Sequence, residues 1–357
     1  MKVFFYPHIS ICFTTKDEKK RMILILRPGE AFLKSERIRR RWEKYLLKNI
    51  QEVLVGIDFS ISKERGRIYI ETKSRATLRR LQWVPGITSI SPAIRTEAEP
   101  PHIVYEAVKL AKRLLKPGMS FAVRARCINQ PFSSRWLERE LGSSILSSIP
   151  NTRVNLSNPS LTLEVEVRGK YAYVFCRRIP GTGGLPVGSG GYVSPICTGR
   201  PEEIIATWFM LKRGCFVQPI VFSSRAERVI KLLKKLHQPM KGMLVPSAPD
   251  RTWRGLAIRM KTAGELGKRM GSAAIVAGEW LDELRKELFE LDKLCPLPVL
   301  RPLVGLSIEE LKEYASNLKL PSPSPSELPP RESLNDLQHL CQQLIQRAEE
   351  ISINPYA

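Results

Sequence analysis

Short runs of alternating apolar and polar residues dominate the first hundred positions, separated by stretches in which apolar residues recur every three or four positions. The alternating runs predict strands and the other stretches predict helices, and their order suits a small split βαβ layer. The predicted strands are residues 3–14, 21–27, 58–62, 67–72 and 87–94, and the predicted helices are residues 34–47 and 75–81. We interpret this layer as a first domain.

Two further patterns follow along the chain. In residues 103–177 we predict helices at 103–115 and 134–147 and strands at 121–127, 161–168 and 171–177. From residue 192 strands and helices alternate, which predicts a parallel doubly wound sheet. Its predicted strands are residues 192–197, 217–222, 242–245 and 273–277, and its helices are 203–213, 226–236, 251–270 and 279–291. A Pro/Ser-rich linker at 319–330 and an amphipathic helix at 333–350 end the pattern.

Composition adds limits to this picture. The 357 residues, 43% of them hydrophobic, suit a globular protein of two or three domains. The apolar runs are far too short to span a membrane. The seven cysteines are scattered without a C-x-x-C pair and the four histidines are isolated, so we expect neither disulfides nor a metal site. The N-terminus lacks a signal segment, and we expect a cytoplasmic location.

The charge points to the partner. The chain carries a formal net charge of +22, which favours a polyanion, and we expect nucleic acid rather than a membrane surface. Residues 1–175 hold 32 Lys and Arg against 16 Asp and Glu, whereas residues 176–357 hold 25 against 19. The anion-binding surface is therefore expected mainly in the N-terminal half.

Two groups of basic residues are candidates for RNA contact. Those in the predicted helix 34–47 recur at helical spacing and could follow a line of phosphates, or form a solvated face: Lys34, Arg37, Arg40, Arg41 and Lys44. In the second unit two arginines alternate along one strand, and cations of the flanking helices could join them in a basic rim: Arg124, Arg126, Lys109, Lys112, Arg113, Arg135 and Arg139. The alternative for the strand arginines is local ion pairing with Glu138 or Glu140.

The predicted strand 192–197 is followed by a turn and a helix, a natural site for a phosphate. Its residues are unsuited to that role: Thr198, Gly199, Arg200, Pro201, Glu202 and Glu203. Arg200 is bulky where glycine would admit a phosphate, Pro201 lacks an N–H, and two carboxylates repel anions. The preceding Gly-rich run, residues 181–191, predicts either a second phosphate cradle or a flexible hinge. We assign no catalytic residue.

Several blocks of sequence resemble the tRNA 4-thiouridine synthetases, also called tRNA sulfurtransferases. Residues 26–34 (LRPGEAFLK), 39–43 (RRRWE) and 46–50 (LLKNI) resemble their N-terminal ferredoxin-like domain, and 120–126 (SFAVRAR) with 139–142 (RELG) resembles their tRNA-binding THUMP domain. Further blocks follow in the family's order: 154–159 (VNLSNP), 183–188 (GGLPVG), 210–214 (MLKRG), 277–279 (AGE) and 297–305 (LPVLRPLVG).

The resemblance implies an α/β multidomain fold that ends in a Rossmann-like, PP-loop ATPase-type domain with a parallel sheet. The implied domains are 1–98, ferredoxin-like; 99–180, THUMP; 190–320, a degenerate PP-loop domain; and 321–357, a linker and C-terminal helix. The family's adenylating loop reads Ser-Gly-Gly-x-Asp-Ser, and here Glu203 replaces its final serine. The family's sulfur-accepting cysteine has no counterpart in residues 320–330, and we expect no rhodanese domain.

Two hypotheses follow. The first is a tRNA-binding protein that contacts the acceptor region, as the resemblance implies, and lacks uridine adenylation and sulfur transfer of its own. The second is a tRNA-modifying enzyme that thiolates uridine with an altered nucleotide loop and an external sulfur donor. We expect no cofactor in the first case and ATP in the second. A separate sulfur-donor or catalytic protein and a homodimer remain open as partners.

Overall fold

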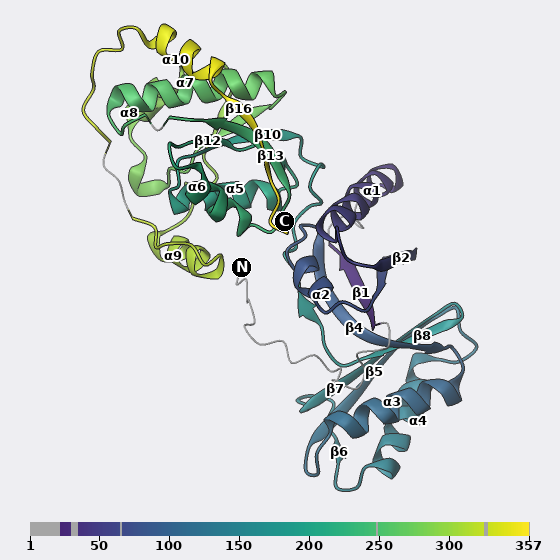
Figure 1. Cartoon of the computed structure of the whole chain (residues 1–357). Coiled ribbons are helices and arrows are strands. Elements are labelled where there is room, and N and C mark those ends of the chain that lie inside the picture. The colour runs from purple at the N-terminus through teal and green to yellow at the C-terminus, as the bar shows by residue number, and fades with distance from the viewer. Residues whose placement is uncertain (1–21, 30–34, 65, 248, 325–327, 357) are drawn as a thin grey trace.

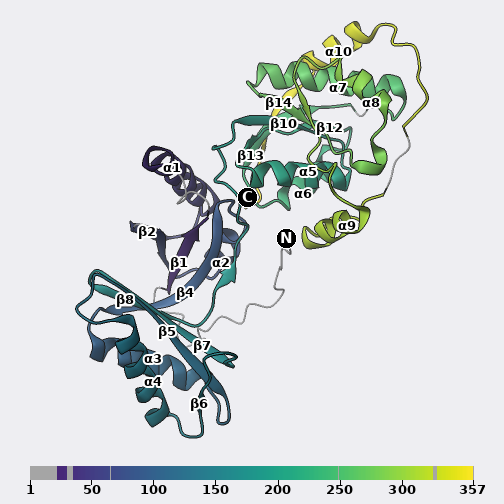
Figure 2. The ribbon, with the colours of Figure 1, turned by 180° about the vertical axis from the view of Figure 1, so that it is seen from behind.

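The structure is a computed structural model that describes residues 22–29, 35–64, 66–247, 249–324 and 328–356. Two lobes, each built on its own sheet, meet at a narrow waist (Figure 1), and the reverse view shows the same separation (Figure 2). The predicted strand at 3–14, Cys12 and Lys34 lie outside the described residues. Within the described ranges, no helix is both long and apolar enough to cross a bilayer.

One continuous sheet carries the N-terminal half of the chain. In the described residues its strands run in the order β2-β3-β1-β4-β8-β7-β5-β6, and β9 pairs with β4. Their bounds are β1 (Met22–Pro28), β2 (Phe59–Glu64), β3 (Arg67–Thr72), β4 (Ile87–Glu97), β5 (Ser120–Ile128), β6 (Arg153–Val154), β7 (Leu161–Arg168), β8 (Tyr171–Phe175) and β9 (Ile179–Pro180). The long strand β4 pairs with β1 along its first part and with β8 along its last four residues, so it belongs to both halves of the sheet.

Each half of this sheet has its own helices and core. Helices α1 (Glu36–Val53) and α2 (Ala76–Leu81) pack on β1, β3 and β4, and α3 (Pro100–Leu114) and α4 (Ser134–Ser148) pack on β5, β7 and β8. In both cores every second strand residue faces the helices, as Leu24 and Leu26 do in β1 and Phe121 and Val123 do in β5. The predicted split βαβ order is therefore present in the first half.

A buried ion network joins the two halves of the sheet on the face away from the helices. Both carboxylate oxygens of Glu166 in β7 accept hydrogen bonds, Oε1 from Arg27 of β1 at 2.9 Å and Oε2 from Arg67 of β3 at 2.8 Å. The Glu166 side chain is only 4% exposed. Burial alone would raise the pKa of Glu166, but Arg67 and Arg27 outweigh it and lower the pKa to about 2.

The C-terminal half forms a second sheet, in the order β15-β14-β10-β12-β13-β16 with β11 beside β10. All of its described pairings are parallel except that of β16 with β13. The strand bounds are β10 (Tyr192–Cys197), β11 (Phe216–Val217), β12 (Ile220–Phe222), β13 (Met240–Val245), β14 (Ala274–Val276), β15 (Val299–Leu300) and β16 (Glu349–Ile353).

Helices cover both faces of this second sheet. Val193 and Cys197 of β10 belong to the core under α5, α6 and α9, whereas Ile196 belongs to the core under α7 and α10. The helix bounds are α5 (Pro201–Lys212), α6 (Ala226–Lys234), α7 (Trp253–Arg269), α8 (Lys286–Asp292), α9 (Ile308–Asn317) and α10 (Leu337–Gln346). This doubly wound arrangement, with the mixed α/β layers of the other lobe, confirms the predicted α/β multidomain fold.

Two local predictions in this domain are wrong. The helix predicted at 333–350 is shorter, and the chain then forms strand β16, which pairs antiparallel with β13 at the sheet edge. The helix predicted at 279–291 is interrupted: a short 3-10 turn, Leu281–Glu283, precedes α8. Both segments have apolar residues at helical spacing. In the first, the residues after α10 pair with β13 at the sheet edge instead of continuing the helix. In the second, the 3-10 turn before α8 contains the buried Glu283.

Aromatic side chains fix the two lobes to each other at the waist. Trp83, just after α2, stacks on His237 with 4.4 Å between ring centroids and packs edge-on against Trp208 of α5. Gln238 donates a hydrogen bond to the Trp83 carbonyl, and the Tyr356 hydroxyl donates one to the His237 carbonyl, each at 2.9 Å. Burial lowers the pKa of His237 to about 4, so this ring is neutral in the stack.

The Gly-rich run 181–191 is a packed connection between the lobes. The amides of Gly181 and Gly183 donate to backbone carbonyls of the N-terminal lobe, and those of Leu185, Gly188 and Gly190 donate to carbonyls of the C-terminal lobe. A Cβ on Gly184 would lie 2.3 Å from the Lys212 carbonyl oxygen, so only glycine fits there. With these amides occupied and this packing tight, the segment is neither an open phosphate cradle nor a free hinge.

We expect Glu166→Gln to destabilise the protein by about 3 kcal/mol, because it leaves the buried Arg27 and the largely buried Arg67 without their counter-charge. Urea unfolding measures the change. Because the pKa of Glu166 is depressed, its stabilising contribution is complete above about pH 4.5 and disappears as the pH falls toward 2, so the difference between variant and wild type should shrink over that window.

Glu164→Gln is the matched control for this substitution. Its carboxylate pairs with Arg178, whose side chain is 52% exposed, so we expect a loss below about 1 kcal/mol. Equal losses for the two variants would contradict a special role for the Glu166 network.

Candidate nucleic-acid interface

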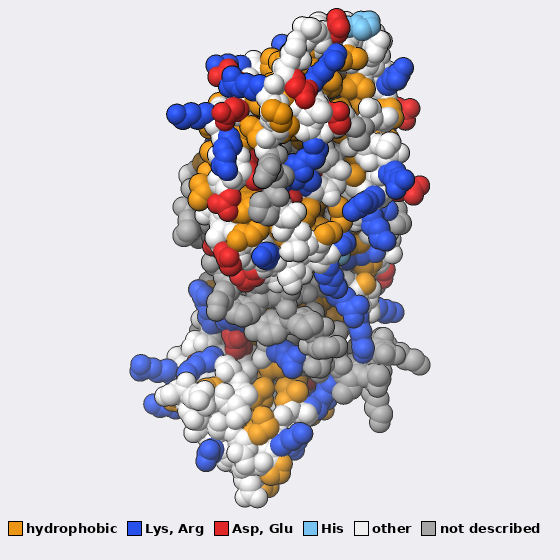
Figure 3. All heavy atoms as spheres, turned by 90° about the vertical axis from the view of Figure 1, so that its left-hand side faces the viewer, with side chains coloured by type: hydrophobic (Ala, Val, Ile, Leu, Met, Phe, Trp, Pro, Cys, Tyr) orange, Lys and Arg blue, Asp and Glu red, His pale blue; other side chains and the backbone are white. Residues whose placement is uncertain are grey.

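On the face shown in Figure 3, Lys and Arg side chains lie on both lobes, with few acidic groups between them in several places. On α1 all of the described candidate residues, Arg37, Arg40, Arg41 and Lys44, are exposed. The helix buries Leu46, Asn49, Ile50 and Val53 instead, so its basic side faces solvent. The structure therefore presents these cations to a partner.

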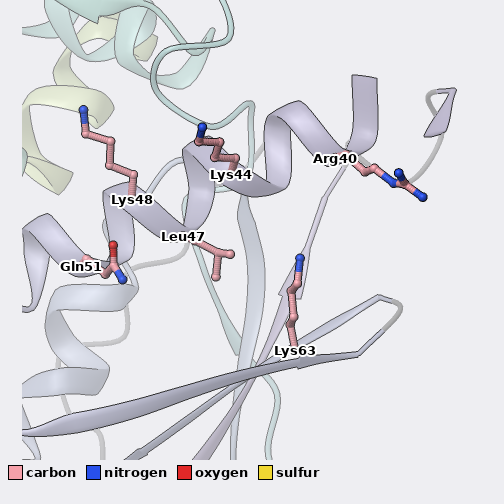
Figure 4. Close-up of a pocket in the computed structure, with 6 residues that line it drawn as sticks. All are labelled: Arg40, Lys44, Leu47, Lys48, Gln51 and Lys63. Atoms are coloured by element: carbon pink, nitrogen blue, oxygen red, sulfur yellow. The ribbon is translucent and has the colours of Figure 1, made fainter. Parts of the chain in front are cut away.

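A shallow groove lies between α1 and β2. Lys44 and Lys48 extend from the same side of the helix, Arg40 extends beyond them, and Lys63 rises from β2 toward the helix (Figure 4). Leu47 and Gln51 complete its lining. Such a groove combines four cations with an amide, a set suited to phosphate and sugar oxygens of RNA.

Acidic neighbours pair with three of the four cations that line this groove. Lys48 lies 3.8 Å from Glu52, Lys63 lies 3.7 Å from Glu43, and Arg40 pairs with Glu36. Among the described residues, Lys44 has no acidic group within ion-pairing distance. Lys63 and Gln51 were not among the sequence candidates, because β2 joins the groove only through tertiary packing.

The two arginines of β5 lie on the face of the sheet opposite α3 and α4. Phe121 and Val123 point into the helix-covered core, and the alternation places Arg124 and Arg126 on the other side, where both are exposed. The Arg124 guanidinium donates to the Leu156 carbonyl at 2.7 Å. In the described part of the chain neither arginine pairs with Glu138 or Glu140, and Glu138 accepts the Ala125 amide instead.

The cations of α3 and α4 are exposed but belong to the helical layer. Lys109, Lys112, Arg113, Arg135 and Arg139 all reach solvent. The sheet lies between their helices and the outward face of β5, so the seven residues do not share one flat surface. The N-terminal turn of α4 does approach the open edge of β5, where Ser134 accepts the Cys127 amide at 2.9 Å.

In the second lobe, the turn between β10 and α5 forms a nest of backbone amides that is already filled. Oε2 of Glu203 accepts hydrogen bonds from the amides of Thr198, Gly199 and Arg200 at 2.6, 3.1 and 3.2 Å. Oε1 accepts the Thr198 hydroxyl at 2.8 Å. Burial raises the pKa of Glu203, while Arg200 and these donors favour its charged form. The carboxylate thus lies where an anion bound to this helix N-terminus would lie.

The Arg200 side chain is held beside this nest by two carboxylates. Its guanidinium pairs with Glu283 at 2.5 Å and lies 3.5 Å from Glu202. Glu202, in turn, accepts the Ser324 amide at 3.0 Å, which ties the segment after α9 to the loop. A Cβ on Gly278 would come within 2.9 Å of the Glu203 nitrogen. The loop residues named from the sequence are thus bonded to one another and to Glu283 and Ser324 outside the loop.

Metal and thiol chemistry have little support in the described residues. The single group of three possible ligands there is Glu97, Glu99 and His102, all of them exposed. Burial raises the pKa of Cys197, Cys215, Cys295 and Cys341, which disfavours reactive thiolates.

Comparison with known proteins defines the class to which this architecture belongs. The ThiI ferredoxin-like domain matches residues 23–91, and the THUMP domain matches residues 98–177. The two matches cover the two halves of the first sheet and identify its parts as a ThiI-type pair of domains.

Relatives extend the similarity to most of the chain. A probable tRNA sulfurtransferase of Caldanaerobacter subterraneus is 31% identical over 327 residues, covering 83% of this chain and 85% of that protein. A probable tRNA sulfurtransferase of Thermococcus kodakarensis is 31% identical over 335 residues, covering 83% and 87%. The chain belongs to the tRNA sulfurtransferase family.

Solved structures agree with this assignment. PH1313 of Pyrococcus horikoshii has a TM-score of 0.71 and 28% identity, and the similarity covers 84% of this chain and all of that one. A 4-thiouridine synthetase, solved as an RNA complex with bound ATP, has a TM-score of 0.78 at 21% identity over 94% of this chain and all of that one. The second structure shares the fold.

We expect Lys44→Ala with Lys48→Ala to weaken binding of a tRNA transcript roughly tenfold in low salt. The slope of log affinity against log salt concentration should fall by about two, because two phosphate contacts are lost. Fluorescence anisotropy over a salt series measures both quantities.

Glu52→Gln provides the opposite change in the same groove. It frees Lys48 from its ion pair, so we expect binding about twofold tighter. Weaker binding in both variants would show that the groove responds to disturbance of α1 rather than to charge.

Proposed function

We propose that this protein binds tRNA through its ferredoxin-like and THUMP domains and does not itself adenylate or thiolate uridine. The observation that carries the second part is the Glu203 carboxylate in the nest of the β10–α5 turn. The proposal makes the C-terminal domain a structural part of an RNA-binding protein.

Family membership and surface charge support the tRNA part of the proposal. The relatives are named tRNA sulfurtransferases, and the 4-thiouridine synthetase that shares this fold was solved with RNA. The exposed cations of α1 and β5 lie on a lobe whose halves share β4, so they are held in fixed relation to each other. A rigid basic surface suits recognition of RNA shape through phosphates and sugars.

The charges and hydrogen bonds at the start of α5 support the proposal that this protein does not adenylate uridine. A phosphate at the start of α5 would need the same amides that now bind Glu203, and it would meet a second buried carboxylate, Glu202, in the first turn. Expelling Glu203 would move a buried charge out of a site with four hydrogen bonds, at a cost of several kcal/mol. The missing sulfur-accepting cysteine in residues 320–330 points the same way.

We expect the purified protein to release neither AMP nor pyrophosphate from ATP when tRNA is added, although it binds that tRNA. Radiolabelled ATP and thin-layer chromatography detect both products. RNA-dependent release that Arg200→Ala abolishes would overturn this proposal and favour the alternative enzyme, which thiolates uridine with an altered loop and an external sulfur donor.

We expect Glu203→Ser to open the nest to inorganic pyrophosphate, because it restores three amide donors that no side chain occupies. Isothermal titration should show binding to this variant and none to wild type. Glu203→Gln is the matched control, since its amide oxygen can still accept these bonds and keep the nest closed. Pyrophosphate binding of equal strength to wild type and Glu203→Ser would contradict the closed nest.

A further inference from the structure

The positive charge of the C-terminal half is concentrated in one short segment. Residues 176–357 carry a net charge of +6, with 25 Lys and Arg against 19 Asp and Glu. Residues 225–241 alone contain six Lys and Arg and one acidic residue, Glu227. The remainder of this half is therefore close to neutral, and its basic character belongs to α6 and the residues that flank it.

Helix α6 separates this charge from its apolar side. Val229, Leu232 and Leu233 are buried in the core beneath the helix. Arg228, Lys231 and Lys234 follow at intervals of three residues, which places them along one side of the helix. Arg228 and Lys231 are exposed, and Lys234 is half-buried.

Most of these cations form no ion pair with an Asp or Glu among the described residues. In the described part of the chain, no Asp or Glu lies within ion-pairing distance of Arg225, Arg228, Lys231 or Lys234. Lys235 differs, because its ammonium donates to the Lys319 carbonyl. A set of adjacent, unneutralised cations on one helix repels itself, so an anionic partner would gain from it.

The end of α6 adjoins the RNA-binding lobe at the waist. His237 and Gln238, a few residues after the helix, contact Trp83 through the ring stack and the hydrogen bond described above. Trp83 lies two residues after the end of α2, whose Arg79 is exposed. A band of Lys and Arg side chains descends along one side of the upper lobe toward the waist (Figure 3). The packed junction holds the basic side of α6 in a fixed position relative to the other lobe.

We propose that the basic side of α6, formed by Arg228, Lys231 and Lys234, binds the sugar-phosphate backbone of the RNA held by the N-terminal lobe. This inference rests on the proposed tRNA binding and extends it to the C-terminal domain. The contact is to phosphates, so it adds affinity and orientation without reading bases. It also assigns the domain a role that does not depend on the nest at Glu203.

The test compares Arg228→Ala with Lys231→Ala, in one protein, against wild type for binding of an unmodified tRNA transcript over a salt series. We expect roughly tenfold weaker binding in low salt and a slope smaller by about two. Both side chains are exposed and lie outside the core, so the unfolding free energy should stay within about 0.5 kcal/mol of wild type.

Lys286→Ala with Lys293→Ala is the charge-matched control in the same domain, at the first residue of α8 and at the residue that follows this helix. Lys293 lies 3.0 Å from Glu290, so removing it takes away a cation that is already paired. We expect wild-type affinity and slope for this control.

The outcomes separate the two proposals. Unchanged affinity and slope in the α6 variant, with wild-type tRNA binding intact, would overturn the α6 contact alone. Absence of tRNA binding in the wild type would overturn the proposed function. An equal loss in the α6 variant and the α8 control would show a general effect of net charge and would also overturn the α6 contact.

Discussion

Strand β4 and the carboxylate of Glu166 hold the N-terminal lobe together, and the basic surfaces of that lobe depend on this connection. The strand supplies hydrogen bonds to the ferredoxin-like half through β1 and to the THUMP half through β8. Glu166 then links β7 to Arg27 of β1 and Arg67 of β3 in an environment that excludes water. A lobe joined in both ways cannot bend between its halves without breaking sheet hydrogen bonds and exposing a buried charge network.

The junction with the second lobe is also held by packed contacts, but here they are aromatic stacking and backbone hydrogen bonds. Trp83, Trp208 and His237 form an aromatic cluster, and the Gly-rich segment is bonded to both sides through its amides. A neutral His237 suits this cluster, because a charged ring would have to be desolvated there. The C-terminal domain is therefore packed firmly against the N-terminal lobe, and its surface, including α6, keeps a fixed position relative to that lobe.

The nest at the start of α5 shows how few residues are needed to close an anion site. The turn and the helix dipole still provide the donors, yet Glu203 supplies the acceptor from within the same helix. Arg200 pairs with Glu202 and Glu283, so a small ion network lies beside the site. The fold of the domain is preserved because a carboxylate and a bound anion satisfy the same amides.

The order of elements and the identity of the basic helices followed from the sequence, because apolar periodicity and charge are local properties that survive in any fold. The residue types of the loop 198–203 likewise indicate that it is unsuited to phosphate, and this stays a prediction. Strand β16 and the interrupted helix before α8 were missed, since edge pairing and burial of Glu283 depend on distant parts of the chain.

Tertiary structure alone decided how the pieces combine. It placed Lys63 beside α1, separated the arginines of β5 from the cations of α3 and α4, and turned a predicted hinge or cradle into a packed connection. It also directed the Glu203 carboxylate back into the nest rather than toward solvent. Sequence determined which groups carry charge and which segments are buried, whereas only three-dimensional packing determined which charges meet, because that depends on distances between residues far apart in the chain.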